Sequence, residues 1–183
     1  MLKCTMPDPA LIDQLEPFHQ DAFSWAAACC GGDAGAGAEA LQEAYVKVAA
    51  GRAAFGGRSA LKTWWLGVVR ITALEQLRRG KRWRRAADDF LDWIGSLTPD
   101  ERTADDEIVV PDAAWLEAAL KQLPARQQEV LQLVFQHQLS LSEAAVVMGV
   151  SVGSARTHYD RAKKKLRNLA SATVPTLFCD HVT

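Results

Sequence analysis

The stretch LSLSEAAVVMGVSVGSARTHYDRAKKKLR, residues 139–167, contains the signals for two short helices joined by a tight turn. Ser140 or Ser142 can cap the first helix, because a hydroxyl accepts hydrogen bonds from the free backbone N–H groups of a first turn. Gly149 allows the tight turn, since glycine has no side chain to restrict the backbone. Ser151 can then cap the second helix. Together these signals predict a helix-turn-helix.

The second helix of this motif combines a packing face with a basic face. At 100° per residue, a stripe about 80° wide contains its apolar side chains. These are Ala155, Tyr159, Ala162, Leu166 and Leu169. Such a helix fits the major groove of DNA, with its first residues at base edges and its later basic residues at phosphates. The expected DNA contacts are Ser154, Arg156, Thr157, His158, Arg161 and Lys164. A solvated basic helix end is the alternative, since Lys and Arg favour helix C-termini.

Apolar residues at helical spacing also occur upstream of this motif. We expect helices over about residues 9–30, 38–50 and 60–79, separated by Gly31 and by the Gly/Arg segment 51–59. No alternation typical of a β-strand extends over a useful length. The predicted fold class is therefore all-α, with two small helical bundles joined by an acidic linker and the helix-turn-helix in the second bundle.

Charge is distributed in blocks, although the net charge is only −1. Residues 51–85 carry ten basic side chains against one acidic, residues 86–117 carry one against ten, and residues 118–170 carry eight against three. Local positive fields of this kind can bind a polyanion. The expected domains are a first bundle over 1–85, an acidic linker over 86–112, a second bundle over 113–170 and a tail of unassigned role over 171–183.

The composition, 49% apolar and 23% charged over 183 residues, is that of an ordinary soluble globular protein. No window of eighteen apolar residues and no signal-peptide pattern occurs, which predicts a cytoplasmic protein without membrane insertion.

Cysteine and histidine spacing indicates neither catalysis nor a metal site. The four cysteines, Cys4, Cys29, Cys30 and Cys179, form no CxxC pair, which is typical of a reducing compartment. The histidines form no HExxH or triad pattern. A zinc site using Cys179, His181 and a distant cysteine would have irregularly spaced ligands close to a terminus. We therefore expect no catalytic residues, no metal and no cofactor.

Residues on both sides of the helix-turn-helix narrow its identity. The relevant segments are Leu123-Pro124, Glu129-Val130-Leu131, Leu141-Ser142-Glu143-Ala144-Ala145, Gly149-Val150-Ser151, Gly153-Ser154-Ala155 and Arg161-Ala162-Lys163. Many helix-turn-helix families share Glu-x-Ala and Gly-Val-Ser, whereas the preceding Leu-Pro and the following Arg-Ala are more specific. This part of the chain resembles the C-terminal DNA-binding domain of bacterial sigma factors.

The N-terminal half resembles the other conserved domain of the same family. Residues 42–47, Gln-Glu-Ala-Tyr-Val-Lys, match its Gln-Glu-x-aromatic-x-Lys segment. The spacing of its Trp…Ile-x-Arg…Asp-x-x-Arg segment is matched by Trp64, Val68, Arg70, Glu75, Leu77, Arg78 and Arg82. Because the chain has room for these two domains alone, it resembles the small extracytoplasmic-function, or group IV, sigma factors over roughly residues 10–168.

This resemblance implies a role in transcription initiation. It implies that the helices around residues 39–47 and 61–77 bind core RNA polymerase, with Glu39, Gln42, Glu43 and Lys47 as the contact residues. For the minus-ten promoter element it implies the loop 51–58, where the family captures a flipped base, and the basic end of the third helix. The corresponding DNA contacts are Phe55, Arg58, Arg78, Arg79 and Arg82. The helix-turn-helix would read the minus-thirty-five element, and the polymerase would perform the chemistry.

The resemblance also implies an anti-sigma factor or another regulator as a partner. Two other classes of function stay open at this point. A helix-turn-helix transcription regulator of another class would need a ligand or receiver domain, and residues 1–85 show neither strands nor an Asp pocket. A metal or redox sensor would have to use the cysteines and histidines.

The chain departs from the family pattern at two places. The acidic cluster that precedes the Gln is reduced to Glu39, after Ala36, Gly37 and Ala38. Ile71 stands where the family usually has Asn. Because the family uses both surfaces for polymerase or promoter contact, three consequences stay open. These are a weakened affinity for polymerase through weaker electrostatic steering, an unusual promoter, and a dependence on modification or on another partner.

Overall fold

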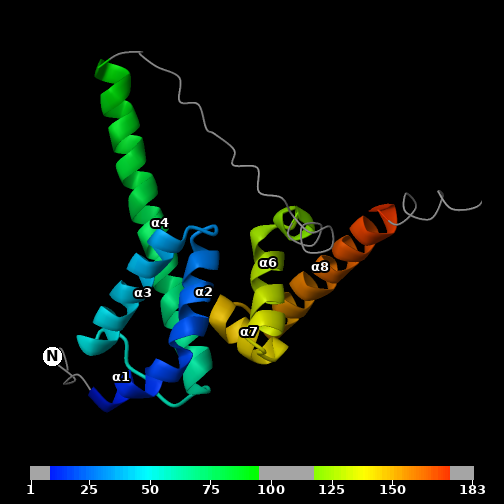
Figure 1. The fold of residues 1–183 in the computed structure, drawn as a ribbon, viewed down its shortest axis with the longest axis horizontal. Helices are drawn as coiled ribbons and strands as arrows, with labels where there is room; N and C mark the ends of the chain where they lie inside the picture. Colours follow the sequence, from blue (N-terminus) through cyan, green and yellow to red (C-terminus); the bar gives the residue numbers. More distant parts are fainter. Residues whose placement is uncertain (1–8, 95–117, 174–183) are drawn as a thin grey trace, which may run out of the picture. The chain divides into compact units, whose positions relative to one another are not determined.

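The computed structural model describes the backbone of residues 9–94 and 118–173 and the side chains of residues 11–80 and 118–170 (Figure 1). All regular elements within those ranges are helical and none is a strand, which confirms the predicted all-α fold. The chain divides into two units, Met1–Ala104 and Asp105–Thr183. Cys4, Cys179 and His181 lie outside the described residues, as do most of the predicted linker and the end of the predicted tail.

The N-terminal unit begins with a bent helical segment rather than with the single helix expected over residues 9–30. It consists of α1 (Pro9–Leu15), the 3-10 turn η1 (Glu16–Phe18) and α2 (His19–Cys29). Pro17 explains the interruption, because proline lacks a backbone N–H and its ring clashes with the preceding turn of an α-helix.

Helix α3 (Ala34–Ala49) begins four residues before its predicted start. Asp33 is its N-cap, and the Asp33 carboxylate accepts a hydrogen bond of 2.9 Å from the backbone N–H of Ala36. On the same helix, Gly37 lies against α2, since a Cβ atom built on it would be 2.7 Å from the backbone of Ala27. The absence of a side chain at Gly37 therefore permits the close approach of α2 and α3.

Helix α4 (Leu61–Ile94) is longer than predicted. The expected end at residue 79 is wrong, and the helix continues into the first residues of the predicted linker. Arg, Lys, Trp and Ala dominate residues 78–87 and are compatible with a helix, and a single glycine, Gly80, costs only about 1 kcal/mol relative to Ala.

The core of the N-terminal unit lies where α2, α3 and α4 pack together. Trp25 and Trp65 are fully buried, and the Trp25 indole N–H donates to the carbonyl oxygen of Leu66 on α4 at 3.1 Å. Trp65 is therefore a packing residue of this core. The smaller members of this core are Leu15, Ala22, Ala26, Ala40, Leu41, Ala44, Val48, Val69 and Ala73.

The C-terminal unit contains a helical turn over residues 118–121, α6 (Ala125–Leu131), the π-helical turn η2 (Gln132–Gln136), α7 (Leu141–Met148) and α8 (Val152–Thr173). Both α6 and α7 pack against α8. The π-helical turn is closed by a hydrogen bond of 3.1 Å from His137 N to Gln132 O. One core cluster of this unit contains Leu120, Leu123, Leu131, Tyr159, Ala162 and Leu166.

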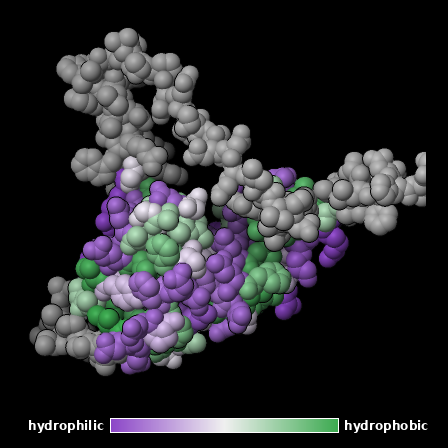
Figure 2. Space-filling view, in the orientation of Figure 1, coloured by the Kyte–Doolittle hydropathy of each residue, from purple (hydrophilic) through white to green (hydrophobic). Residues whose placement is uncertain are grey.

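The described surface mixes hydrophilic and hydrophobic patches (Figure 2). Large apolar side chains that are exposed there include Val46, Ile71, Phe135, Val146 and Val152.

Candidate functional site

The helix-turn-helix has the local geometry that its sequence predicts. Ser140 caps α7: its hydroxyl accepts from Glu143 N at 3.3 Å, and its own backbone N–H donates to Glu143 Oε2 at 2.9 Å. This is a capping box, and it assigns the cap to Ser140 rather than Ser142. Gly149 ends α7 in the left-handed region, at φ +65°. Ser151 then caps α8 by accepting from Ser154 N at 3.1 Å.

Helix α8 divides into the two faces that were predicted. Ala155 and Ala162 are fully buried, whereas Tyr159, Leu166 and Leu169 are half-buried. Most of the predicted DNA contacts lie on the exposed side, with His158 half-buried at its margin. The exposed ones are Ser154, Arg156, Thr157, Arg161 and Lys164. The face that packs on α6 and α7 therefore holds the helix while the polar face stays open to a ligand.

An aromatic pair on this unit, with one exposed ring and one half-buried ring, was not predicted. Phe135, on the π-helical turn, is 66% exposed, and its ring stacks on that of Tyr159 with centroids 6.2 Å apart. Lys163 Nζ lies 5.0 Å from the centroid of the Tyr159 ring. The apolar periodicity of α6 and α8 shows which residues are apolar, but it does not show that a π-helical turn directs Phe135 outward.

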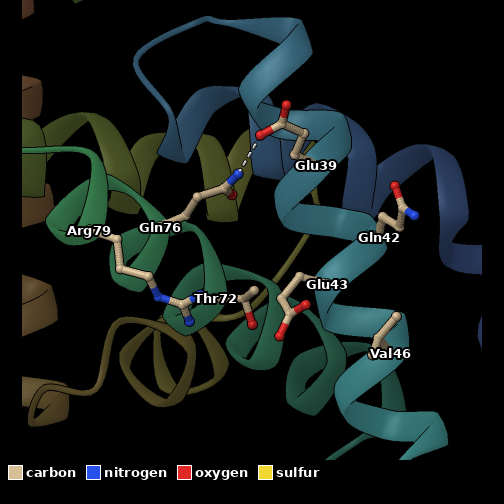
Figure 3. Close-up of a pocket in the computed structure, with 7 residues that line it drawn as sticks. All are labelled: Glu39, Gln42, Glu43, Val46, Thr72, Gln76 and Arg79. Carbon is tan, nitrogen blue, oxygen red and sulfur yellow. Dashed lines mark hydrogen bonds between the residues drawn. The ribbon is translucent and has the colours of Figure 1, made fainter. Parts of the chain in front are cut away.

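A groove lies between α3 and α4 in the N-terminal unit (Figure 3). Its volume is about 270 Å³, and its residues are Glu39, Gln42, Glu43 and Val46 from α3 with Thr72, Gln76 and Arg79 from α4. Three of the four residues expected to bind polymerase therefore line one groove. Glu39 Oε2 accepts a hydrogen bond of 2.8 Å from Gln76 Nε2, which joins the two walls.

The sequence analysis expected the helix over residues 61–77 to take part in polymerase binding, but it named no contact residue on the α4 wall of this groove. Thr72, Gln76 and Arg79 follow one another at spacings of four and three residues, which places them on the same side of a helix. That spacing was a usable signal. It did not identify α3 as the facing helix, because contacts between helices cannot be read from one helix alone.

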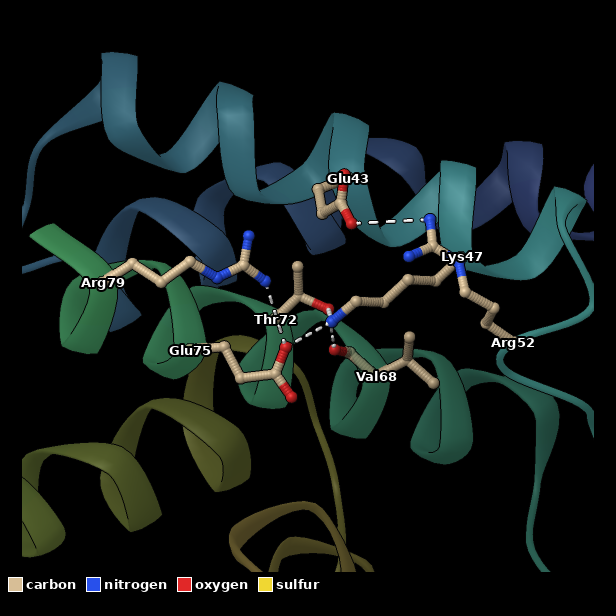
Figure 4. A network of polar contacts seen from close by, with 7 residues as sticks. All are labelled: Glu43, Lys47, Arg52, Val68, Thr72, Glu75 and Arg79. Carbon is tan, nitrogen blue, oxygen red and sulfur yellow. Dashed lines mark hydrogen bonds and ion pairs between the residues drawn. The ribbon is translucent and has the colours of Figure 1, made fainter.

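Lys47, the fourth residue expected to bind polymerase, makes its polar contacts inside the unit (Figure 4). Its ammonium donates to Glu75 Oε2 at 2.7 Å and to Thr72 Oγ1 at 3.1 Å, and its side chain is only 15% exposed. Glu75 also pairs with Arg79 at 3.7 Å. The hydrogen bond from Lys47 is the main reason that the pKa of the Glu75 carboxyl is lowered, and partial burial opposes the shift.

The loop after α3 contains the residues expected to read the minus-ten element. The Phe55 side chain is half-buried and its ring lies 5.3 Å from that of Trp64, whereas Arg58 is exposed. Arg52, at the start of the loop, pairs with Glu43 at 3.6 Å. A role for Phe55 with a flipped base stays a prediction, and in this structure the ring packs on Trp64.

The outer face of α4 continues from that loop. Ile71, in the family's usual Asn position, is 55% exposed. Arg78, two helical turns further along α4, is also exposed. Positions 64, 71 and 78 are seven residues apart and share one side of the helix. Arg82 belongs to the same side by spacing, and its side chain lies outside the described ones.

The described residues contain no group of three or more His, Cys, Asp or Glu side chains that could hold a metal ion. Cys29 and Cys30 are half-buried there, and burial, followed by Asp33 and Glu39, raises the pKa of the Cys30 thiol. A raised pKa disfavours the reactive thiolate.

None of the helices in the described ranges is long and apolar enough to span a bilayer.

Comparison with known proteins agrees with this geometry. The family model of sigma-70 region 4 matches residues 113–166, which include α6, α7 and most of α8. The extracytoplasmic-function sigma factor SigX of Bacillus subtilis is 31% identical over 129 residues, which are 69% of this chain and 66% of SigX. This chain belongs to the extracytoplasmic-function sigma factors.

The match to other sigma factors extends across both units. A probable RNA polymerase sigma factor of Haemophilus influenzae is 26% identical over 145 residues, covering 72% of this chain and 75% of the relative. This sigma factor spans about two thirds of the length of SigX. Its fold also matches the sigma factor RpoE in a co-crystal structure with the anti-sigma factor NepR from Bartonella quintana, with TM-score 0.66, 19% identity, and 91% and 99% of the two chains covered.

Proposed function

We propose that this sigma factor binds core RNA polymerase and directs it to promoter DNA for transcription initiation. The observation that carries the proposal is the exposed polar face of α8. The helix-turn-helix has caps on both of its helices, and Ala155 and Ala162 are buried on the opposite side of α8. The domains we assign are residues 1–85 for polymerase and the minus-ten element, 86–112 as a linker and 113–170 for the minus-thirty-five element.

For the minus-thirty-five element, we assign the reading of bases to the first two turns of α8. Ser154, Arg156 and Thr157 are exposed there, and Arg is suited to guanine because its guanidinium can donate two hydrogen bonds to O6 and N7. Arg161 and Lys164, one to two turns later, would contact phosphates. Base contacts determine sequence preference and phosphate contacts fix the register of the helix.

For the minus-ten element, we assign the loop 51–58 and the outer face of α4. Phe55 would leave Trp64 to stack on an unpaired base, and Arg58, Arg78 and Arg82 would contact the DNA backbone. This surface lies on the same unit as the α3–α4 groove. One unit could therefore contact polymerase and the melted strand together.

The polymerase-binding surface that we assign is the α3–α4 groove, through Glu39, Gln42 and Glu43. The chain would perform no catalytic step, since polymerase forms the phosphodiester bonds, and it would act in the bacterial cytoplasm, where promoters and polymerase are. The solved structure of RpoE with NepR supports an anti-sigma factor as a further partner of a chain with this fold.

Transcription in vitro from a promoter library tests this proposal. Core polymerase should initiate at a new set of start sites when this protein is added, and those promoters should share two sequence elements. Arg156→Ala is the matched variant, because it should change the preference at the upstream element and leave core-polymerase binding intact. The absence of protein-dependent start sites, together with no binding to core polymerase, would contradict the proposal.

A further inference from the structure

Two adjacent arginines, Arg78 and Arg79, lie on different sides of α4. Neighbouring residues in an α-helix are about 100° apart around its axis, so their side chains point toward different surfaces. Arg79 lines the α3–α4 groove, together with Glu39, Gln42 and Glu43. Arg78 is exposed on the outer face that continues from Ile71. The two guanidinium groups therefore face different surfaces, although both lie close enough to Glu75 to help lower the pKa of its carboxyl.

One ion pair along α4 links the Arg79 side chain to the groove. Arg79 Nη2 lies 3.7 Å from Glu75 Oε2, and Glu75 is itself held by the 2.7 Å contact with Lys47 (Figure 4). The Arg79 side chain is nevertheless 59% exposed. It can therefore donate further hydrogen bonds to a group that enters the groove.

The charges around Arg79 favour a protein partner over DNA. Glu39 and Glu43 line the opposite wall of the groove (Figure 3), so a phosphate that approached Arg79 there would also face two carboxylates. A protein surface can carry both signs of charge. It can place a carboxylate at Arg79 and a basic or amide group at the α3 wall, which satisfies both walls at once.

We propose that Arg79 is a polymerase-binding residue of the groove, where its guanidinium binds a carboxylate of core polymerase, rather than a DNA contact. This inference rests on the proposed function and extends it to the α4 wall. The two arginines would then bind different partners, Arg78 the promoter DNA and Arg79 the polymerase.

The test compares Arg79→Ala with Arg78→Ala, a matched change of the same side chain one residue away. Affinity for core polymerase, measured by fluorescence anisotropy of the labelled full-length chain, should fall about tenfold for Arg79→Ala and stay within about twofold for Arg78→Ala. Arg79→Lys should retain more affinity than Arg79→Ala, and Arg79→Glu should retain less. Circular dichroism checks that each variant keeps its helices.

A second measurement uses promoter DNA with core polymerase at saturating concentration. Arg78→Ala should lessen the salt dependence of promoter binding, because fewer counterions are released when one phosphate contact is lost. Arg79→Ala should leave that slope unchanged. Equal polymerase affinity for wild type and Arg79→Ala, or a flattened slope for Arg79→Ala, would overturn the inference while the proposed function stands. If the wild-type chain itself fails to bind core polymerase, both are overturned.

Discussion

The ammonium of Lys47 on α3 and the carboxylate of Glu75 on α4 are 2.7 Å apart, and this contact ties the two walls of the groove together. Thr72 Oγ1 accepts a second hydrogen bond from Lys47 and donates its own proton to Val68 O at 2.9 Å. Lys47 therefore fixes the position of α3 on α4, although its place in the family motif suggested an outward contact. The surface that we assign to polymerase thus depends on a side chain that points inward.

Replacing Lys47 by Met should lower the free energy of unfolding by about 0.5 to 1 kcal/mol, because Glu75 and Thr72 lose a donor while packing volume is kept. The loss is small because Glu75 is 42% exposed and water screens the pair. Urea unfolding of Lys47→Met, Glu75→Gln and the double variant measures the coupling between the two side chains. Fully additive effects of the two changes would show that the pair contributes nothing to stability.

Stability should also depend on pH through Glu75. Its carboxyl has a pKa below the ordinary value of 4.5 in the folded chain, chiefly because of the hydrogen bond from Lys47. A carboxyl with a lowered pKa stabilises the fold above its unfolded pKa, and this contribution is lost as the pH falls through the folded pKa. The difference in unfolding free energy between wild type and Glu75→Gln should therefore shrink as the pH is lowered from 7 to below 4.5. A difference that stays constant over that range would contradict this assignment.

Arg156→Ala should relax sequence preference at one position of the upstream element and weaken binding there by about 1–3 kcal/mol. Lys164→Ala, on the same exposed side of α8, should weaken all sequences alike, because a phosphate contact carries no base information. Binding to a set of single-base promoter variants separates the two effects. If both variants weaken every sequence equally, Arg156 contacts only phosphate.

Glu39→Ala should weaken binding to core polymerase by about two- to fivefold, because it removes a charge and the hydrogen bond to Gln76. Glu39→Gln is the control, since it removes the charge and keeps an oxygen that can accept from Gln76. Ala38→Asp, at an exposed neighbouring position, should strengthen binding by a similar factor. Equal affinity of wild type, Glu39→Ala and Ala38→Asp would assign polymerase binding to another surface.

Gly37→Ala should destabilise the N-terminal unit by about 1–3 kcal/mol, because the new Cβ would stand 2.7 Å from the backbone of Ala27. Gly67→Ala is the matched change on α4, where an added Cβ meets nothing within 4 Å. It should stabilise by up to about 1 kcal/mol, since Ala has the higher helix propensity. Thermal unfolding of both variants tests this contrast: the melting temperature should fall for Gly37→Ala and rise for Gly67→Ala. A change of the same sign in both variants would contradict the prediction.

The elements that were predicted correctly are those whose signals are local. The cap at Ser140, the turn at Gly149 and the cap at Ser151 each act within a few residues, so the sequence contains the whole interaction. The end of α4 was missed because strong helix formers on both sides of Gly80 outweigh one glycine. The break at Pro17 had a local signal that helical periodicity on either side concealed.

The site was predicted less completely, because partners across helices are not encoded in spacing. Gln42 and Glu43 were identified from the family motif, and they line the groove. The inward direction of Lys47 depends on Thr72 and Glu75, which are 25 and 28 residues away along the chain. Arg79 was grouped with Arg78 by charge, and only the facing helix α3 distinguishes their surroundings.

The tight packing at Gly37 also restricts how the reduced acidic cluster could evolve. Position 37 cannot accept a carboxylate without separating α2 from α3, so selection for stronger polymerase binding would have to act on its neighbours. Ala38 is exposed, and every Ala codon becomes an Asp or a Glu codon by a single base change. The contact between Gly37 and the backbone of α2 thus limits how this surface can gain negative charge. Position 37 does not tolerate a side chain, whereas position 38 is one mutation away from a carboxylate.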